Sequence, residues 1–281
     1  FAVAGGLFVW AISIEFERSP LQSRLFSRLA ASMTYSVVPG ESETTRFPDA
    51  GPYNQRLGYA RMPEFIEALK QQDFTIDRQA EISPAMRSFI DYGGFHIFPE
   101  KAQAGLAVLD RAGRDIYLTR HPERVFPSFA AIPPLIVETL LFVENRELLN
   151  AEFPTRNPAI EWDRFALASA NVITEKLHLG NTHFGGSTLA TQIEKYRHSP
   201  EGRTGSIGDK LTQMTSASVR AYADGPETSA ARRRITLDYL NSTPLSARPG
   251  YGEVIGLGDG LWAWYGTELG ELVRLLSKEA R

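Results

Sequence analysis

The chain has 281 residues, 43% hydrophobic and 22% charged, which is enough to fold one large domain or two small ones. Its formal net charge of −3 argues against a nucleic-acid-binding protein that works by bulk electrostatics. The lack of cysteine excludes disulfides, thiolate metal sites and a cysteine nucleophile, and the five histidines do not have metal-ligand spacing on one helix face.

The N-terminal segment, residues 1–14, carries no charged side chain. A helix needs about 20 apolar residues to cross a bilayer, and this segment is shorter, so we interpret it as the end of a truncated transmembrane anchor. Trp10 suits the interfacial end of such a helix. A buried helix or a signal-peptide remnant is the alternative interpretation.

Residues 15–52 are predicted to form a membrane-proximal helix over residues 15–38 and then a linker. Apolar residues recur among arginines in the helical part, which is typical of a helix at a membrane surface or of an ordinary surface helix. Residues 53–100 are expected to be a small α+β accessory module without a catalytic motif. In it we predict a helix after Pro63, a strand at residues 74–76 and a second helix after Pro84.

A β-hairpin and a helix are expected next. Two β-prone runs within residues 105–119 flank Asp110–Arg114, and the glycine in that stretch favours a turn. The helix is predicted over residues 135–149, because Pro133-Pro134 favours a helix start.

Glu144 lies within this predicted helix, in line with an apolar stripe. It falls at helical spacing from Val137, Leu141 and Leu148. A carboxylate in that position is costly unless it is paired or protonated, and such a setting is typical of a general base. A glutamate at a helix end that bends toward solvent is the alternative.

The segment 183–195 joins two glycines to a helix start. Gly185-Gly186 frees the backbone to approach a ligand closely, and Ser187 or Thr188 can cap a helix that runs on through Lys195. The free N–H groups and the positive end of the helix dipole favour an anion there, and the lysine adds a full charge. An ordinary capped helix start is the alternative interpretation.

Further helices are predicted over residues 160–179, 207–223 and 269–281, with a glycine-rich loop at residues 198–208. The run Arg232–Arg234 can hold a pyrophosphate or lipid head groups, although a solvated helix face is the alternative.

Four segments, in this order, resemble the signatures of the family 51 glycosyltransferases, the peptidoglycan transglycosylases found alone or at the front of bifunctional penicillin-binding proteins. They are Glu144-Asn145-Arg146-Glu147-Leu148, Gly185 to Gln192, Asp209 to Gln213, and Leu237-Asp238-Tyr239-Leu240-Asn241. The resemblance covers residues 103–266. It implies a mainly α, lysozyme-like glycosyltransferase domain over residues 101–281, which follows the accessory module.

The resemblance implies that lipid II is the substrate and that the growing glycan is its partner. A sugar 4-hydroxyl would attack C1 of the lipid-linked glycan, with inversion, and undecaprenyl diphosphate would leave. Glu144 would be the catalytic base. Cations and N–H groups would steady the diphosphate, and further side chains would hold the sugar or brace the site; these substrate-binding residues are Arg146, Gly186, Ser187, Thr188, Gln192, Lys195, Lys210, Tyr239, Asn241 and Arg248.

Gln213 departs from the family pattern, which has a second catalytic glutamate at this position. That glutamate orients the leaving group directly or through a divalent metal, Mg or Mn, and glutamine neither ionises nor ligates a metal well. Asp209, Glu194 and Asp238 are candidates to replace it. The chain is therefore expected to be a divergent transferase, or else an impaired relative that binds lipid II or a cell-wall partner. A lysozyme-like hydrolase is a third alternative.

The resemblance and the apolar N-terminus together imply a location. We expect a single-pass protein of the bacterial inner membrane with its catalytic domain on the outer, periplasmic side. Residues 53–100 are then a docking site for cell-wall synthesis partners, and nucleic acid is not expected as a partner.

Overall fold

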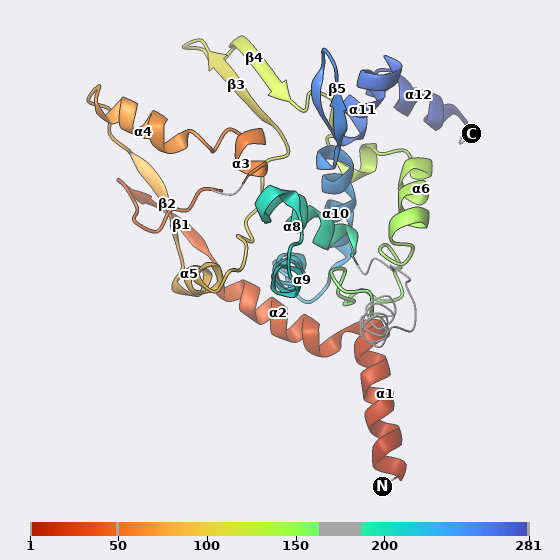
Figure 1. Ribbon diagram of the computed structural model, residues 1–281. Helices are drawn as coiled ribbons and strands as arrows, with labels where there is room; N and C mark the ends of the chain where they lie inside the picture. Colours follow the sequence, from red (N-terminus) through yellow and green to blue (C-terminus); the bar gives the residue numbers. More distant parts are fainter. Residues whose placement is uncertain (1, 49–50, 163–186, 280–281) are drawn as a thin grey trace.

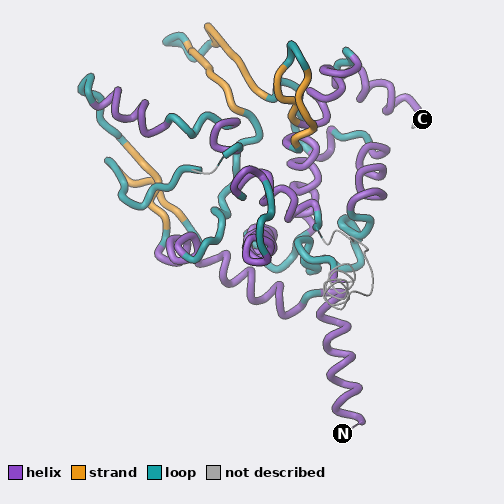
Figure 2. Tube along the Cα trace, viewed as in Figure 1, coloured by secondary structure: helices purple, strands orange, loops and turns teal. Residues whose placement is uncertain are grey.

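The computed structural model describes residues 2–48, 51–162 and 187–279. Within these ranges the chain is mainly helical, with two-stranded antiparallel sheets as its β structure (Figures 1 and 2). The expectation of a mainly α fold is confirmed. The predicted helix over residues 160–179 lies almost wholly outside the described residues, as do Gly185 and Gly186.

Two helices, α1 (Ala2–Arg18) and α2 (Pro20–Ser32), form the N-terminal part, and α1 projects away from the rest of the molecule (Figure 1). Ser19, at φ 51°, separates them. The Glu15 carboxylate accepts the backbone N–H groups of Leu21 and Gln22 at 2.8 and 2.9 Å and so secures the start of α2. Of the described helices, none is long and apolar enough to span a bilayer.

The prediction of one helix over residues 15–38 is wrong after Ser32, where α2 ends. Residues Tyr35–Pro39 form strand β1, which pairs with β2 (Arg78–Ile82) so that Tyr35 faces Ile82. The predicted strand at residues 74–76 is correspondingly misplaced. The β-branched pair Val37-Val38 suits a strand, but only the distant partner β2 makes that preference effective.

Three short helices complete the accessory region: α3 (Tyr53–Arg56), α4 (Met62–Lys70) and α5 (Pro84–Asp91). Helix α5 begins at the predicted Pro84 and α4 one residue before Pro63, and Ser83 caps α5 by accepting the Met86 N–H. A small core joins this region to the rest of the chain, because side chains from α2, β2 and α5 pack with Val219 of α9 (Ile207–Ala221). Partner docking through residues 53–100 stays a prediction.

Two hairpins follow the accessory region. The first, β3 (Ala104–Leu109) with β4 (Asp115–His121), is the predicted hairpin, and its turn is held by Asp110, which accepts the N–H groups of Ala112 and Arg114. The second hairpin, β5 (Pro244–Arg248) with β6 (Gly252–Ile255), was not predicted.

The main core lies among α6 (Pro134–Glu144), α8 (Leu189–His198), α10 (Ser229–Ser242), α11 (Gly256–Tyr265) and α12 (Leu269–Glu279). Its buried residues include Val137, Leu141 and Leu148, the predicted apolar stripe. The helix itself ends five positions earlier than predicted, at Glu144, because Asn145 takes an extended conformation. Helix α8 packs against both α9 and α10.

Candidate functional site

Helix α8 organises the site. The predicted cap is confirmed at Thr188, whose side chain accepts the Thr191 N–H, while the Thr191 hydroxyl accepts the Thr188 N–H at 3.0 Å. Helical spacing puts Gln192 and Lys195 on one face of α8, away from Glu194 and Arg197. The first face turns toward α6 and the second toward α9 and residues 96–100.

Glu144, at the end of α6, meets α8 through Gln192. The Gln192 Nε2 donates to Glu144 Oε2 at 3.0 Å, and the Tyr239 hydroxyl donates to Gln192 Oε1 at 3.3 Å. Burial, and to a smaller extent the charge of Glu144, raises the pKa of Tyr239, so its hydroxyl keeps its proton. The tyrosine thereby fixes the amide with its N–H₂ group toward the carboxylate.

Two lysines add positive charge on the same side of α8. Lys210, on α9, donates through Nζ to Ser187 Oγ at 2.5 Å. Burial and the charge of neighbouring Lys195 both lower the pKa of Lys210. Neither lysine forms an ion pair within the described part of the chain. An anion bound between them would relieve their mutual repulsion, as a phosphate does.

Gln213 is not part of this group. It lies one turn after Lys210 but is only 1% exposed. Its Nε2 donates to Ser199 Oγ at 2.8 Å and to Thr204 Oγ1 at 3.0 Å, while its Oε1 accepts from Thr204 at 3.1 Å. The carboxamide therefore ties the loop after α8 to α9, and a catalytic role for Gln213 stays a prediction.

Three more predicted residues have structural partners. Asn241 is buried and exchanges two hydrogen bonds of 2.9 Å with the backbone of Phe126, which braces α10. Arg146 is exposed; its guanidinium lies 4.1 Å from the Phe142 ring centroid and donates to the Phe142 carbonyl. Arg248 donates to the Ala263 carbonyl and fastens the second hairpin to α11. Gly186 lies outside the described residues.

Two of the three candidate replacements for the missing carboxylate, Asp209 and Glu194, are also engaged elsewhere. Asp209 accepts the N–H groups of Gly205 and Ser206 and closes the capping box of α9, which lowers its pKa. Glu194 pairs with Arg220 at 2.7 Å. Among the described residues no three carboxylate or imidazole groups converge to hold a metal ion. A divalent metal at the diphosphate stays a prediction.

A buried ionic network that the sequence did not indicate supports the other face of α8. Glu100 contacts Arg197 at 3.1 Å, His198 at 2.7 Å and Arg220 at 3.3 Å. Burial would raise the pKa of Glu100, but the two arginines and the contact with His198 outweigh it and hold the pKa well below its usual range. The only sequence signal is the i, i+3, i+4 spacing of charged residues in α8, which does not reveal the distant partner.

The comparisons agree with the geometry at the level of the family. The sequence matches the family model described as Transglycosylase over residues 113–277, more than half of the chain. No curated protein matches it. The chain belongs to the transglycosylases of glycosyltransferase family 51, whose family-level activity is peptidoglycan glycosyl transfer.

Proposed function

We propose that the protein polymerises lipid II into glycan strands and releases undecaprenyl diphosphate. One observation carries the proposal: Gln192 on α8 donates to the Glu144 carboxylate of α6, and Lys195, on the same face of α8, lies close enough to Lys210 of α9 to lower its pKa. An acid for proton removal and cations for a departing diphosphate are the two requirements of this reaction.

In the proposed reaction Glu144 takes the proton of the acceptor's sugar 4-hydroxyl. The freed oxygen attacks C1 of the lipid-linked glycan from the side opposite the diphosphate, and the bond from C1 to the diphosphate oxygen breaks, with inversion. Gln192, oriented by Tyr239, keeps the carboxylate in position. Lys195 and Lys210 neutralise charge that grows on the leaving diphosphate, and Ser187 adds a hydroxyl next to Lys210.

The alternative is a catalytically impaired relative that binds lipid II without turnover. The position of Gln213 favours it, because the residue is neutral, buried and bonded to the loop at residues 199–204. Under the main proposal the two lysines neutralise the negative charge of the leaving diphosphate, and no second carboxylate takes part.

We also propose that residues 1–14 attach the protein to the outer side of the bacterial inner membrane. Helix α1 projects from the molecule (Figure 1) and exposes Leu7, Val9 and Trp10 at 60%, 67% and 63%. Exposed apolar side chains on a helix without charges before Glu15 are suited to lipid.

Incubation of the full chain with fluorescent lipid II in detergent, followed by gel electrophoresis, tests the proposal. Polymer sensitive to lysozyme supports the transferase. Saturable lipid II binding with no polymer identifies the impaired relative instead. Release of sugars from finished cell wall would contradict both and indicate a hydrolase.

A further inference from the structure

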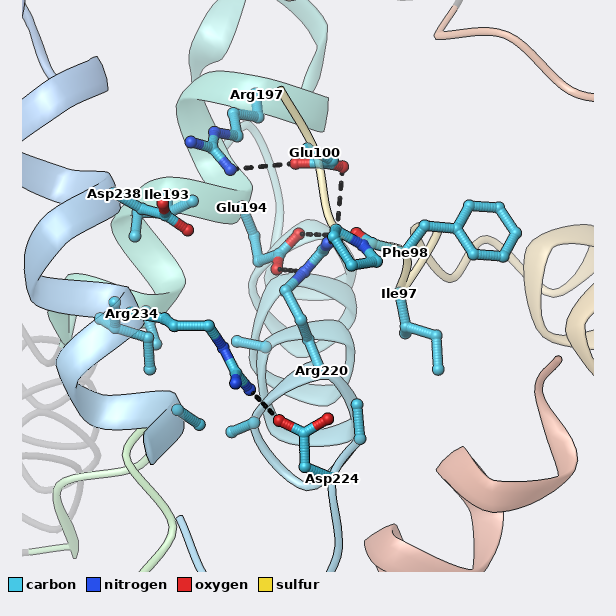
Figure 3. Close-up of a pocket in the computed structure, with 17 residues that line it drawn as sticks. Ile97, Phe98, Glu100, Ile193, Glu194, Arg197, Arg220, Asp224, Arg234 and Asp238 are labelled. Carbon is cyan, nitrogen blue, oxygen red and sulfur yellow. Dashed lines mark hydrogen bonds and ion pairs between the residues drawn. The ribbon is translucent and has the colours of Figure 1, made fainter. Parts of the chain in front are cut away.

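A cavity of about 300 Å³ is lined by Ile193, Glu194 and Arg197 of α8, which Figure 3 labels. Helical spacing places these residues on the other side of α8 from Gln192 and Lys195. Residues 97–100, α8, α9 and α10 enclose it. Much of its wall is apolar, formed by Ile97, Phe98, Ala190, Ile193, Ala217 and Ile235. This volume and lining suit a small organic molecule.

Most charged groups on the cavity wall are paired with each other. Glu194 pairs with Arg220 at 2.7 Å, and Glu100 bridges both buried arginines. At the exposed edge Arg234 pairs with Asp224 at 2.5 Å, and Figure 3 shows these contacts as dashed lines. Asp238 differs, because within the described residues its carboxylate has no hydrogen bond and no ion pair.

Arg197 supplies a second unused group. The side chain is 3% exposed, and its terminal nitrogens donate to Glu100 and Ser242 at 3.1 and 2.9 Å. Among the residues that the structure describes, its Nε–H has no partner. A buried donor without a partner is costly, and a bound acceptor removes that cost. Asp238 lies close enough to Arg197 to feel its charge: burial raises the pKa of Asp238, and the arginine lowers it.

We propose that this cavity binds a small neutral molecule with an apolar body and one amide group. The amide carbonyl would accept from Arg197 Nε–H, and the amide N–H would donate to the Asp238 carboxylate. An ammonium group satisfies only the aspartate, a carboxylate satisfies only the arginine, and a hydrocarbon satisfies neither. The site goes beyond the proposed function and does not depend on it, because it shares no side chain with the Glu144 group.

The test compares four probes of similar size on the full chain: 2-phenylacetamide, phenylacetate, 2-phenylethylammonium and ethylbenzene. Methyl signals of Ile193 and Ile235 in the cavity report binding by NMR, and Ile207, 77% exposed at the start of α9, is the reference. We expect the amide to shift the cavity signals and to bind at least about tenfold more tightly than the other three. N-acetylphenylalanine methylamide, added as a further arm, shows whether the amide comes from a peptide or from a smaller molecule.

Variants of the aspartate sharpen the result. Asp238→Asn keeps an oxygen acceptor and should bind the amide within a fewfold of the parent. Asp238→Leu should weaken it at least about tenfold. Asp224→Asn, at the cavity edge, is the matched control and should bind normally.

Three results would overturn the proposal, and all can be obtained with the unaltered chain should a variant fail to fold. Tighter binding of the ammonium probe would make this a cation site. Equal binding of ethylbenzene would make it a nonspecific apolar cavity. An absence of cavity shifts with either amide would show that it takes no amide.

Discussion

At the scale of single residues, the candidate site depends on charges that have few protein partners. Lys210 donates a hydrogen bond to Ser187, and the charge of Lys195 acts on Lys210 through space. Both remain available to a phosphate oxygen, which would form charge-assisted hydrogen bonds with them. At Gln213 a carboxamide stands where the family has a carboxylate, and it forms hydrogen bonds with the neighbouring hydroxyls of Ser199 and Thr204.

Lys210→Gln is expected to weaken binding of lipid II about tenfold, because one charge-assisted hydrogen bond contributes about 1.5 kcal/mol. The affinity should also depend less on salt than that of the parent. Fluorescence titration with labelled lipid II at two ionic strengths measures both. Lys70→Gln, which removes an exposed pair with Glu41, is the control. Equal affinities for both variants would remove Lys210 from the substrate site.

Gln213→Leu should lower the free energy of unfolding by about 1–3 kcal/mol, because it leaves the buried Ser199 hydroxyl without its partner and removes the hydrogen bonds with Thr204. Urea unfolding measures the change, and Gln71→Leu on the exposed end of α4 should be near neutral. In Gln213→Glu both hydroxyls can donate to the new carboxylate, so this variant should fold. A stability loss no larger than that of the Gln71 control would contradict the role of Gln213 in tying the loop after α8 to α9.

At the scale of elements, α8 is held from two sides. Its Gln192 face meets α6 and α10, and its Arg197 face meets Glu100 of the accessory region and Arg220 of α9. The network therefore positions the helix that carries part of the candidate site.

Glu100→Gln should lower the stability near neutral pH by about 3 kcal/mol, because it leaves buried arginines short of a counter-charge. The pKa of Glu100 is depressed in the folded state, so its stabilising effect is complete above the pKa in the unfolded chain, about 4.3, and is lost as the pH falls below it. The free energy of unfolding, measured with urea and expressed relative to its value at pH 7, should thus fall more steeply toward pH 3 for the parent than for the variant. Parallel profiles would contradict this role, and Glu41→Gln is the exposed control.

Local signals predicted some elements well and others not at all. Helix α9 was expected over residues 207–223 and is found at Ile207–Ala221, because its capping serine and its periodicity lie within the segment itself. Strands β1 and β2 could not be placed, since Tyr35 finds its partner at Ile82. The apolar stripe of helix α6 was predicted, but its end was not. The helix stops at Glu144 because Asn145 is not helical, and no local sequence pattern predicts that conformation.

At the scale of the whole molecule, the parts of the site that resemble family motifs could be predicted by position, and the tertiary contacts could not. Gln192 and Lys210 were proposed from the order of the motifs, and Glu144 from that order together with its place on an apolar stripe. The buried orientation of the Gln213 side chain depends on Ser199 and Thr204. The Glu100 network depends on a segment about a hundred residues before α9. Such contacts require the fold.

The projecting N-terminal helix yields a prediction for membrane attachment. The pair of substitutions Leu7→Glu and Trp10→Glu should abolish flotation of the full chain with phosphatidylglycerol vesicles, because both side chains are exposed apolar groups on α1. Thermal unfolding should be unchanged, since neither side chain is buried. The matched pair Leu69→Glu and Phe74→Glu, exposed at the end of α4 and just after it, should still float. If the chain with both substitutions in α1 still floats with the vesicles, α1 does not attach the protein to the membrane.

The central claim is that Glu144 and the two lysines act on one substrate. Polymer formation by Glu144→Gln, compared with Glu138→Gln at an exposed position of the same helix, tests it most directly. We expect Glu144→Gln to lower the rate of polymer formation about a hundredfold or more, with lipid II binding retained, and Glu138→Gln to polymerise at the normal rate. Equal polymer formation by the two variants would contradict it.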